Sequence, residues 1–157
     1  MTDVFSRTKR SAIMAAVSQR NTRPELVVRR ILHSMGFRFR LHSKSLPGTP
    51  DIILTKFHSV IFVHGCFWHG HAGCARATLP KSNQSFWKRK IKGNKARDRR
   101  VKCQLTKLGW RYLVVWQCAT RSPPRLEASL RRFLDPSSAP RKPIVPRIAV
   151  SPPRQRL

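Results

Sequence analysis

The stretch Ser59–Cys74, which reads SVIFVHGCFWHGHAGC, holds most of the residues in this chain that could do chemistry. An apolar run typical of a β-strand leads into a segment with three histidines, two cysteines and an aromatic pair. Core packing alone does not call for such a mixture. A buried strand that ends at Gly65 and continues as a Cys/His-rich loop would present metal ligands and reactive imidazoles at the edge of a sheet.

One candidate site is a closed zinc site with the spacing C-x4-H-x2-C-x43-C, formed by Cys66, His71, Cys74 and Cys118. Three thiolates and an imidazole suit tetrahedral zinc and leave no position for water, so the ion would be structural. It would hold the loop after one central strand to the end of another. The alternative is a set of scattered buried cysteines and exposed histidines, because the short spacings match no common zinc-finger pattern. Cys103, on a basic helix, is expected to play no part.

A second candidate site combines Asp51 with His64 and His69. Hydrolysis of a phosphodiester requires a divalent cation held by oxygen ligands and a base that deprotonates water. Asp51 can supply the first, and a neutral His69 can supply the second. An aspartate at the start of a strand is usually a turn or cap residue. In a chain with only 6 acidic residues, the catalytic interpretation gains weight.

Two aromatic pairs form the third candidate: Phe67-Trp68 in the loop, and Phe86-Trp87 at the start of a basic helix. Packing in the core is the commoner fate of such rings. Adjacent residues on an irregular loop, however, cannot easily all point inward. Large rings beside Lys and Arg can wedge between base pairs or stack on unpaired bases.

The composition indicates a polyanionic partner, because 33 Lys and Arg against 6 acidic residues give a net charge of +27 over 157 residues. No run of about 18 apolar residues occurs, and the N-terminus lacks the apolar core of a secretory signal, so we expect neither membrane insertion nor export. The length suits one domain with a modest core and a tail. Four irregularly spaced cysteines in a reducing compartment favour metal ligands over disulfides.

The first half of the chain predicts two helices, a half-buried strand and a hairpin. Thr22-Arg-Pro-Glu25 is a capping box that starts a helix ending at Gly36. Glu25 is fully explained as the capping residue, and any further role stays open. A short amphipathic helix over Ser6–Ser18 precedes it, and a strand over Phe37–Leu41 follows.

The hairpin pairs Asp51–Thr55 with Ser59–His64 and is closed by Lys56-Phe-His58. Antiparallel neighbours bring the start of one strand beside the end of the other, so Asp51 should lie next to Val63 and His64.

The second half predicts two helices, a buried strand that delivers Cys118, and a last amphipathic helix. Gly93-Asn94 is expected to separate the two helices. The elements are Ser85–Ile91, Lys95–Leu108, Trp110–Trp116 and a helix carrying Leu126, Leu130 and Phe133. Residues 135–157 are rich in Pro, Arg and Ser, which predicts a disordered basic tail after a domain over residues 1–134.

From about Arg7 to Cys118 the sequence resembles the very-short-patch-repair (Vsr) DNA mismatch endonucleases of the PD-(D/E)XK nuclease superfamily. The motifs that carry the resemblance, in order, are TRPE, LPGTPD, VHGCFWHGH, FW, RDRR and GWR…VVWQC. The resemblance implies an α/β, restriction-endonuclease-like single domain with a central mixed β-sheet flanked by helices and a structural zinc site.

The activity that the resemblance implies is a cut in one strand, 5′ to the thymine of a T:G mismatch left when 5-methylcytosine deaminates. It further implies magnesium and zinc as cofactors, double-stranded DNA carrying the mismatch as the partner, and other repair proteins as candidate partners. The acting form would be a monomer in the bacterial cytoplasm, at the nucleoid.

Position by position, the resemblance implies Asp51 as the magnesium ligand and His69 as the residue that activates water. Glu25 and His64 would hold metal-bound waters, and Asp98 would be a supporting acidic residue. Val63 stands where some members have threonine, so it would bind magnesium only through its main-chain carbonyl. The resemblance assigns Phe67, Trp68 and Trp87 to DNA, and Cys66, His71, Cys74 and Cys118 to zinc. The last loop of the zinc site, Ala72-Gly73, is one residue longer than in some relatives.

The rival interpretation is a non-catalytic, zinc-stabilised module that binds DNA or RNA through charge alone. The composition and the tail fit it equally well. The convergence of Asp51 and His69 at one end of a sheet favours the enzyme, as does an ordered set of motifs that charge alone would not require.

Overall fold

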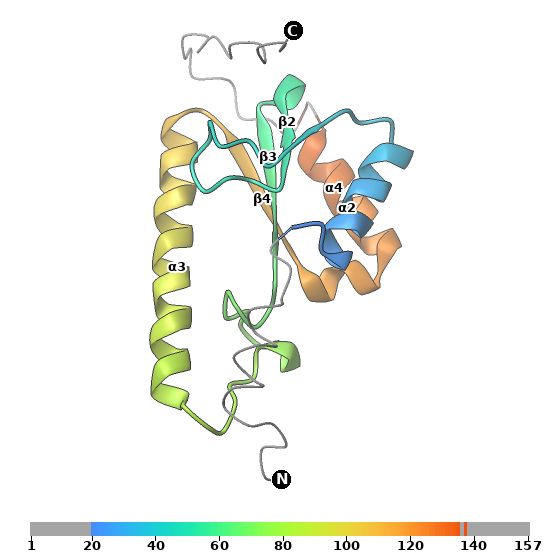
Figure 1. Ribbon diagram of the computed structural model, residues 1–157. Coiled ribbons are helices and arrows are strands. Elements are labelled where there is room, and N and C mark those ends of the chain that lie inside the picture. The colour runs from blue at the N-terminus through green and yellow to red at the C-terminus, as the bar shows by residue number, and fades with distance from the viewer. Residues whose placement is uncertain (1–19, 136, 138–157) are drawn as a thin grey trace, which may run out of the picture.

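The computed structural model describes residues 20–135 and residue 137 (Figure 1). The predicted helix over Ser6–Ser18 and nearly all of the predicted tail lie outside the described residues. Among the helices of the described part, none has an apolar stretch long enough to cross a membrane.

A four-stranded mixed sheet in the order β1-β2-β3-β4 forms the centre of the molecule. The strands are β1 (Arg40–Leu41), β2 (Ile52–Leu54), β3 (Ser59–His64) and β4 (Arg111–Trp116). Strand β2 is antiparallel to both of its neighbours, β1 and β3, whereas β3 and β4 are parallel. A parallel pair needs a long crossover, and α3 (Gln84–Lys107) lies within it. The prediction of a central mixed sheet flanked by helices is confirmed.

Helices cover both faces of the sheet (Figure 1). On one face lie α2 (Arg23–Ser34) and α4 (Pro123–Leu134), and on the other lies α3. Alternation along β3 explains the division, because successive side chains of a strand point to opposite faces. Ile61 packs with Val28 and Leu126 in the α2/α4 core. Phe62, one residue later, packs with Leu105 of α3.

The capping box predicted at the start of α2 is present. The Glu25 amide donates to the Thr22 hydroxyl, and the Glu25 carboxylate accepts from the Thr22 amide. Pro24 occupies the first turn, where its missing amide hydrogen costs nothing. Helix α2 ends before Gly36, whose φ of +80° lies in the left-handed region that glycine adopts easily.

The structure differs most from the prediction in two places. The two helices separated at Gly93-Asn94 are one continuous helix of 24 residues, α3. A glycine inside a helix costs only about 1 kcal/mol relative to alanine, so the turns on both sides outweigh it. The predicted strand over Phe37–Leu41 is reduced to Arg40–Leu41, because β2 is three residues long and only Arg40 and Leu41 find partners on it.

Candidate active site and metal centre

Asp51 and Val63 meet at one end of the sheet, as the hairpin predicted. The main-chain amide of Val63 donates to Oδ2 of Asp51 over 2.7 Å. Burial raises the pKa of the Asp51 carboxyl above its usual value, and the Val63 amide opposes that shift. The hydrogen bond occupies one carboxylate oxygen, so Oδ1 remains for other ligands.

Three further side chains converge on Asp51 from the α2 side of the sheet. Glu25 is only 3% exposed and accepts from Nη2 of Arg29 over 2.8 Å. His42 lies between the two carboxylates, with Nδ1 at 4.0 Å from Oδ1 of Asp51 and Nε2 at 3.9 Å from Oε2 of Glu25. Arg29 and His42 were missed by the sequence analysis, because no motif or spacing connects them with Asp51.

The two histidines of the loop region form a separate group with Asp98 of α3. Nδ1 of His69 lies 2.6 Å from Oδ2 of Asp98, and Nδ1 of His64 lies 4.0 Å from the same oxygen. The two imidazoles stack, with ring centroids 3.7 Å apart and planes inclined by 13°. Burial, together with the charge of the neighbouring His69, lowers the pKa of His64 to about 3. His64 is therefore a neutral imidazole at neutral pH.

Asp51, His64 and His69 were expected to form a single group. In the structure they lie at the same end of the sheet but in two groups. His64 and His69 contact Asp98, whereas Asp51 contacts the Val63 amide and faces His42. Ligand atoms of His64, His69 and Asp98 lie within 4.8 Å of one another and could hold a metal ion. Two imidazoles suit a transition metal better than magnesium, which prefers oxygen ligands. A carboxylate such as that of Asp51 therefore suits magnesium better than this histidine group does.

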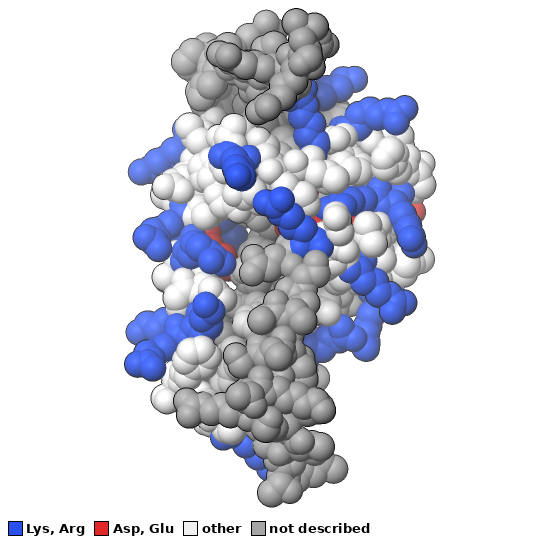
Figure 2. All heavy atoms as spheres, in the orientation of Figure 1, with Lys and Arg blue, Asp and Glu red and all other residues white. Residues whose placement is uncertain are grey.

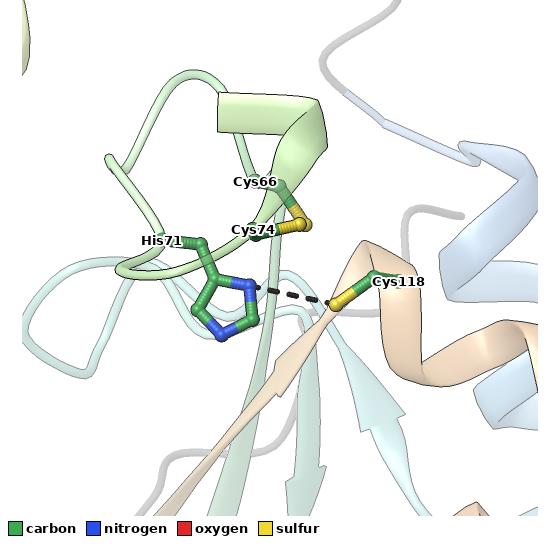
Figure 3. A group of neighbouring side chains, drawn as sticks. All are labelled: Cys66, His71, Cys74 and Cys118. Atoms are coloured by element: carbon green, nitrogen blue, oxygen red, sulfur yellow. Dashed lines mark hydrogen bonds between the residues drawn. The ribbon is translucent and has the colours of Figure 1, made fainter. Parts of the chain in front are cut away.

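The four candidate zinc ligands come together from the loop and from the end of β4 (Figure 3). Their ligand atoms lie within 4.8 Å of one another. Sγ of Cys118 is 3.4 Å from Nδ1 of His71. When zinc is bound tetrahedrally with ordinary bond lengths, a sulfur ligand and a nitrogen ligand lie about 3.6 Å apart, so the observed distance is close to that of a zinc site. The donor set and its spacing fit a closed zinc site, and the four residues are Cys66, His71, Cys74 and Cys118.

The cysteines of this cluster differ in their surroundings. Burial raises the pKa of the Cys66 thiol to about 11, whereas the main-chain amide of Arg76 lowers the pKa of Cys74. A bound cation would overcome this cost at Cys66, because a thiol that coordinates a metal releases its proton to solvent and binds as the thiolate.

Trp116 joins the cysteine cluster to the paired histidines. Its ring stacks on His71, with centroids 4.1 Å apart and planes inclined by 7°. The same ring contacts His64 edge-on at 5.6 Å. The segment from Cys66 to His71, which carries His69, is closed by a hydrogen bond from the His71 amide to the Cys66 carbonyl over 2.9 Å. A metal in the cysteine cluster would therefore fix the loop that carries His69.

Phe67, Trp68 and Trp87 form one aromatic cluster. Their ring centroids lie 5.1 to 5.9 Å apart in edge-to-face arrangements. Asn94 of α3 supports the cluster by donating to the Trp68 carbonyl over 2.8 Å. Trp87 is 8% exposed, whereas its neighbour Phe86 is 50% exposed. Trp87 thus underlies the two partly exposed loop rings.

Basic side chains surround this region, and Figure 2 shows Lys and Arg spread widely over one face. Two hollows beside α3 have volumes of about 470 and 490 Å³, and the lining of each includes four Lys or Arg side chains and no acidic residue. Such concave basic surfaces attract phosphates. The cations of the first hollow are Lys88, Lys92, Lys95 and Arg99, and those of the second are Arg89, Lys90, Arg97 and Arg100.

Comparison with known proteins gives consistent matches. The family model described as DNA mismatch endonuclease Vsr matches residues 2–76. The Type II nicking enzyme V.XorIIP of Xanthomonas oryzae is 54% identical over 137 residues, which cover 87% of this chain and 100% of that protein. The Type II nicking enzyme V.NmeAIP of Neisseria meningitidis is 41% identical over 85% of this chain and 95% of its own. The DNA mismatch endonuclease Vsr of Escherichia coli is 42% identical over 80% of each chain.

Proposed function

This chain belongs to the Vsr family of DNA mismatch endonucleases and is an endodeoxyribonuclease, and we propose that it uses magnesium to cut one DNA strand 5′ to the thymine of a T:G mismatch. Such mismatches arise when 5-methylcytosine deaminates. The names of the nicking-enzyme relatives support a cut in a single strand. The observation that carries the proposal is the pairing of His69 with Asp98 at the sheet end where Asp51 also lies.

His69 is the proposed general base. With Asp98 at 2.6 Å, the imidazole proton resides on Nδ1, and the lone pair of Nε2 is free to accept a proton from water. The carboxylate of Asp98 then stabilises the imidazolium that forms. His64, neutral and stacked on His69, holds the plane of the base.

Asp51 is the proposed magnesium ligand, together with the main-chain carbonyl of Val63. Carboxylate, carbonyl and water oxygens are the ligands that magnesium prefers. Glu25 and His64 would position water around the ion. A bound magnesium ion would polarise the scissile phosphate and stabilise the charge that develops on the leaving oxygen.

Phe67 and Trp68 are the residues proposed to enter the duplex. An aromatic wedge costs least where base pairing is already poor, so it favours a mismatch over a Watson–Crick pair. In this proposal Trp87 supports both rings from below, and zinc bound to Cys66, His71, Cys74 and Cys118 fixes the loop that carries them.

Electrostatic attraction to the phosphate backbone supplies the remaining affinity. We assign catalysis to residues 1–134, acting as a monomer, and sequence-independent attraction to the basic segment 135–157. Five basic side chains of this segment would steepen the salt dependence of binding without selecting a sequence. They are Arg141, Lys142, Arg147, Arg154 and Arg156.

The test is a single-turnover nicking assay with zinc-loaded protein on duplexes that differ only in a T:G or a C:G pair, with and without added magnesium. We expect nicking of the T:G duplex alone, and only with magnesium. Asp51→Ala and His69→Ala should abolish nicking while zinc content and duplex affinity persist, because both residues act on the chemical step. The exposed His33→Ala serves as the control. A protein that binds the T:G duplex but nicks no duplex would be the non-catalytic, zinc-stabilised module.

A further inference from the structure

His42 occupies an unusual backbone conformation beside the proposed magnesium ligand. Its φ of +48° lies in the left-handed region, which residues other than glycine rarely adopt. The imidazole is 16% exposed and lies between the carboxylates of Glu25 and Asp51. Backbone outliers of this kind cluster at functional sites, where the surrounding structure maintains them.

The contact between His42 and Arg29 determines which ring nitrogen carries the proton. Nη2 of Arg29 lies 3.1 Å from Nε2 of His42. A guanidinium can only donate hydrogen bonds, so Nε2 must be the acceptor. In the neutral imidazole the proton then resides on Nδ1, the atom that lies 4.0 Å from Oδ1 of Asp51. Oδ2 of Asp51 already accepts from the Val63 amide, so the His42 N–H faces the remaining oxygen.

Arg29 is itself held in place from the start of α2. It donates to Oδ1 of Asn21 over 2.7 Å and to Oε2 of Glu25 over 2.8 Å, and Glu25 is fixed by the capping box. Nε of Arg29 is buried and has no hydrogen-bond partner among the described residues. A buried donor without a partner costs stability, so stability alone does not account for this network.

We propose that His42 is a positioning residue that donates its Nδ1 proton towards Oδ1 of Asp51 and thereby orients the carboxylate for magnesium. Arg29 acts through His42 by setting its tautomer. This inference rests on the proposed function, in which Asp51 is the magnesium ligand. The gap of 4.0 Å closes with a small movement of the carboxylate, and contacts of this kind tighten when an active site is filled.

The first experiment measures the His42 tautomer and magnesium binding directly and requires no DNA cleavage. Nitrogen NMR of the free, zinc-loaded protein should show the His42 proton on Nδ1 and a bare Nε2. Magnesium is then titrated into the same protein, and the Val63 amide resonance reports binding, because that amide is hydrogen-bonded to Asp51. Groups that orient a metal ligand typically contribute 10–100-fold to metal affinity, so His42→Ala should raise the magnesium Kd by about that factor.

Two variants sharpen the result. His42→Gln should restore most of the affinity, because its amide oxygen can accept from Arg29 while its NH₂ group donates to Asp51. His58→Ala is the matched control: His58 has a φ of +50° and lies beside the start of β3, at the other end from Val63. It should leave the magnesium Kd unchanged.

The outcomes separate this inference from the proposed function. A proton on Nε2 of His42, or an unchanged Kd in His42→Ala, would overturn the positioning role even if Asp51→Asn abolished magnesium binding. An unchanged titration in Asp51→Asn would overturn the metal assignment and this inference together. If His42→Ala fails to show a cooperative thermal transition, the tautomer of the wild-type protein and the Kd of His42→Gln decide the question.

Discussion

Nδ1 of His69 lies 2.6 Å from Oδ2 of Asp98, a residue 29 positions later in the chain. The two meet because the end of β3 and helix α3 share one face of the sheet, on which Phe62 packs against Leu105. A carboxylate at this distance fixes the imidazole proton on Nδ1 and leaves Nε2 as the acceptor. This is the arrangement that the general base proposed above requires.

Asp98→Asn tests whether this pair matters for the reaction. The amide has nearly the same shape, but its NH₂ group can donate to Nδ1 and so stabilise the wrong tautomer of His69. We expect the single-turnover nicking rate of a T:G duplex to fall by roughly 10²-fold or more, the usual contribution of a general base. Duplex affinity and zinc content should not change.

Glu127→Gln is the control for the lost charge, because the Glu127 side chain is 43% exposed and forms an ion pair with Arg131, far from the proposed site in the chain. Its nicking rate should match that of the wild type. An Asp98→Asn protein that nicks at the wild-type rate would show that His69 does not depend on Asp98.

Local signals made most of the fold predictable. The capping box of α2 depends on residues three positions apart, and the hairpin that places Asp51 beside Val63 depends on a short turn between two apolar runs. The continuity of α3 was not predicted, because Gly93-Asn94 is typical of a helix break, whereas a glycine costs a helix only about 1 kcal/mol and the turns on both sides outweigh it.

The composition of the candidate site was harder to predict than the fold. The partnership of His69 with Asp98, and that of His42 with Arg29 and Asp51, arise from tertiary contacts between separate elements. No periodicity or spacing encodes such contacts. The ligand set of the cysteine cluster was predictable, because thiols and an imidazole are chemically distinctive wherever they lie in the sequence.

Removal of zinc should unfold the protein. The ion would join the loop after β3 to the end of β4 in a chain with a net charge of +27, which repels itself. Structural zinc binding in small peptides contributes about 10–16 kcal/mol, comparable to the 5–15 kcal/mol by which whole domains are stable. We expect one zinc per chain, and loss of the cooperative thermal transition on chelation.

Two cysteine variants localise the effect. Cys118→Ser should lose both zinc and the cooperative transition, whereas Cys103→Ser should keep both, because Cys103 is exposed and lies outside the cluster. Metal analysis and thermal unfolding provide the readouts. A metal-free protein that unfolds cooperatively at the wild-type temperature would rule out the structural role.

Trp68→Ala and Trp87→Ala should separate recognition from packing. Trp68 is partly exposed, so its loss should reduce the preference for a T:G over a C:G duplex more than it weakens general binding. Trp87 is buried, so its replacement should cost about 3–5 kcal/mol of stability. Binding titrations with both duplexes and thermal unfolding measure the two effects. An equal loss of affinity on both duplexes in Trp68→Ala would indicate that Trp68 is a packing residue.

Replacement of Gly48 by alanine should both destabilise the turn before Asp51 and slow the reaction. It has a φ of +75°, and a Cβ placed there would lie 2.5 Å from Cγ1 and 3.3 Å from Cβ of Val101 on α3. A β-branched side chain is stiff, so Val101 cannot simply turn aside. The turn must move instead, and Asp51 follows it by three residues.

Gly36 offers the matched comparison, with a φ of +80° and no heavy atom within 4 Å of the added Cβ. Gly36→Ala should lose roughly 1–2 kcal/mol of stability for its left-handed conformation alone and nick normally once folded. Gly48→Ala should lose roughly a further 1–3 kcal/mol from the clash and nick more slowly even where it is fully folded. Denaturant unfolding and single-turnover nicking at low temperature measure both. Equal stability and equal rates in the two variants would mean that Val101 yields and that the position of Asp51 does not depend on this contact.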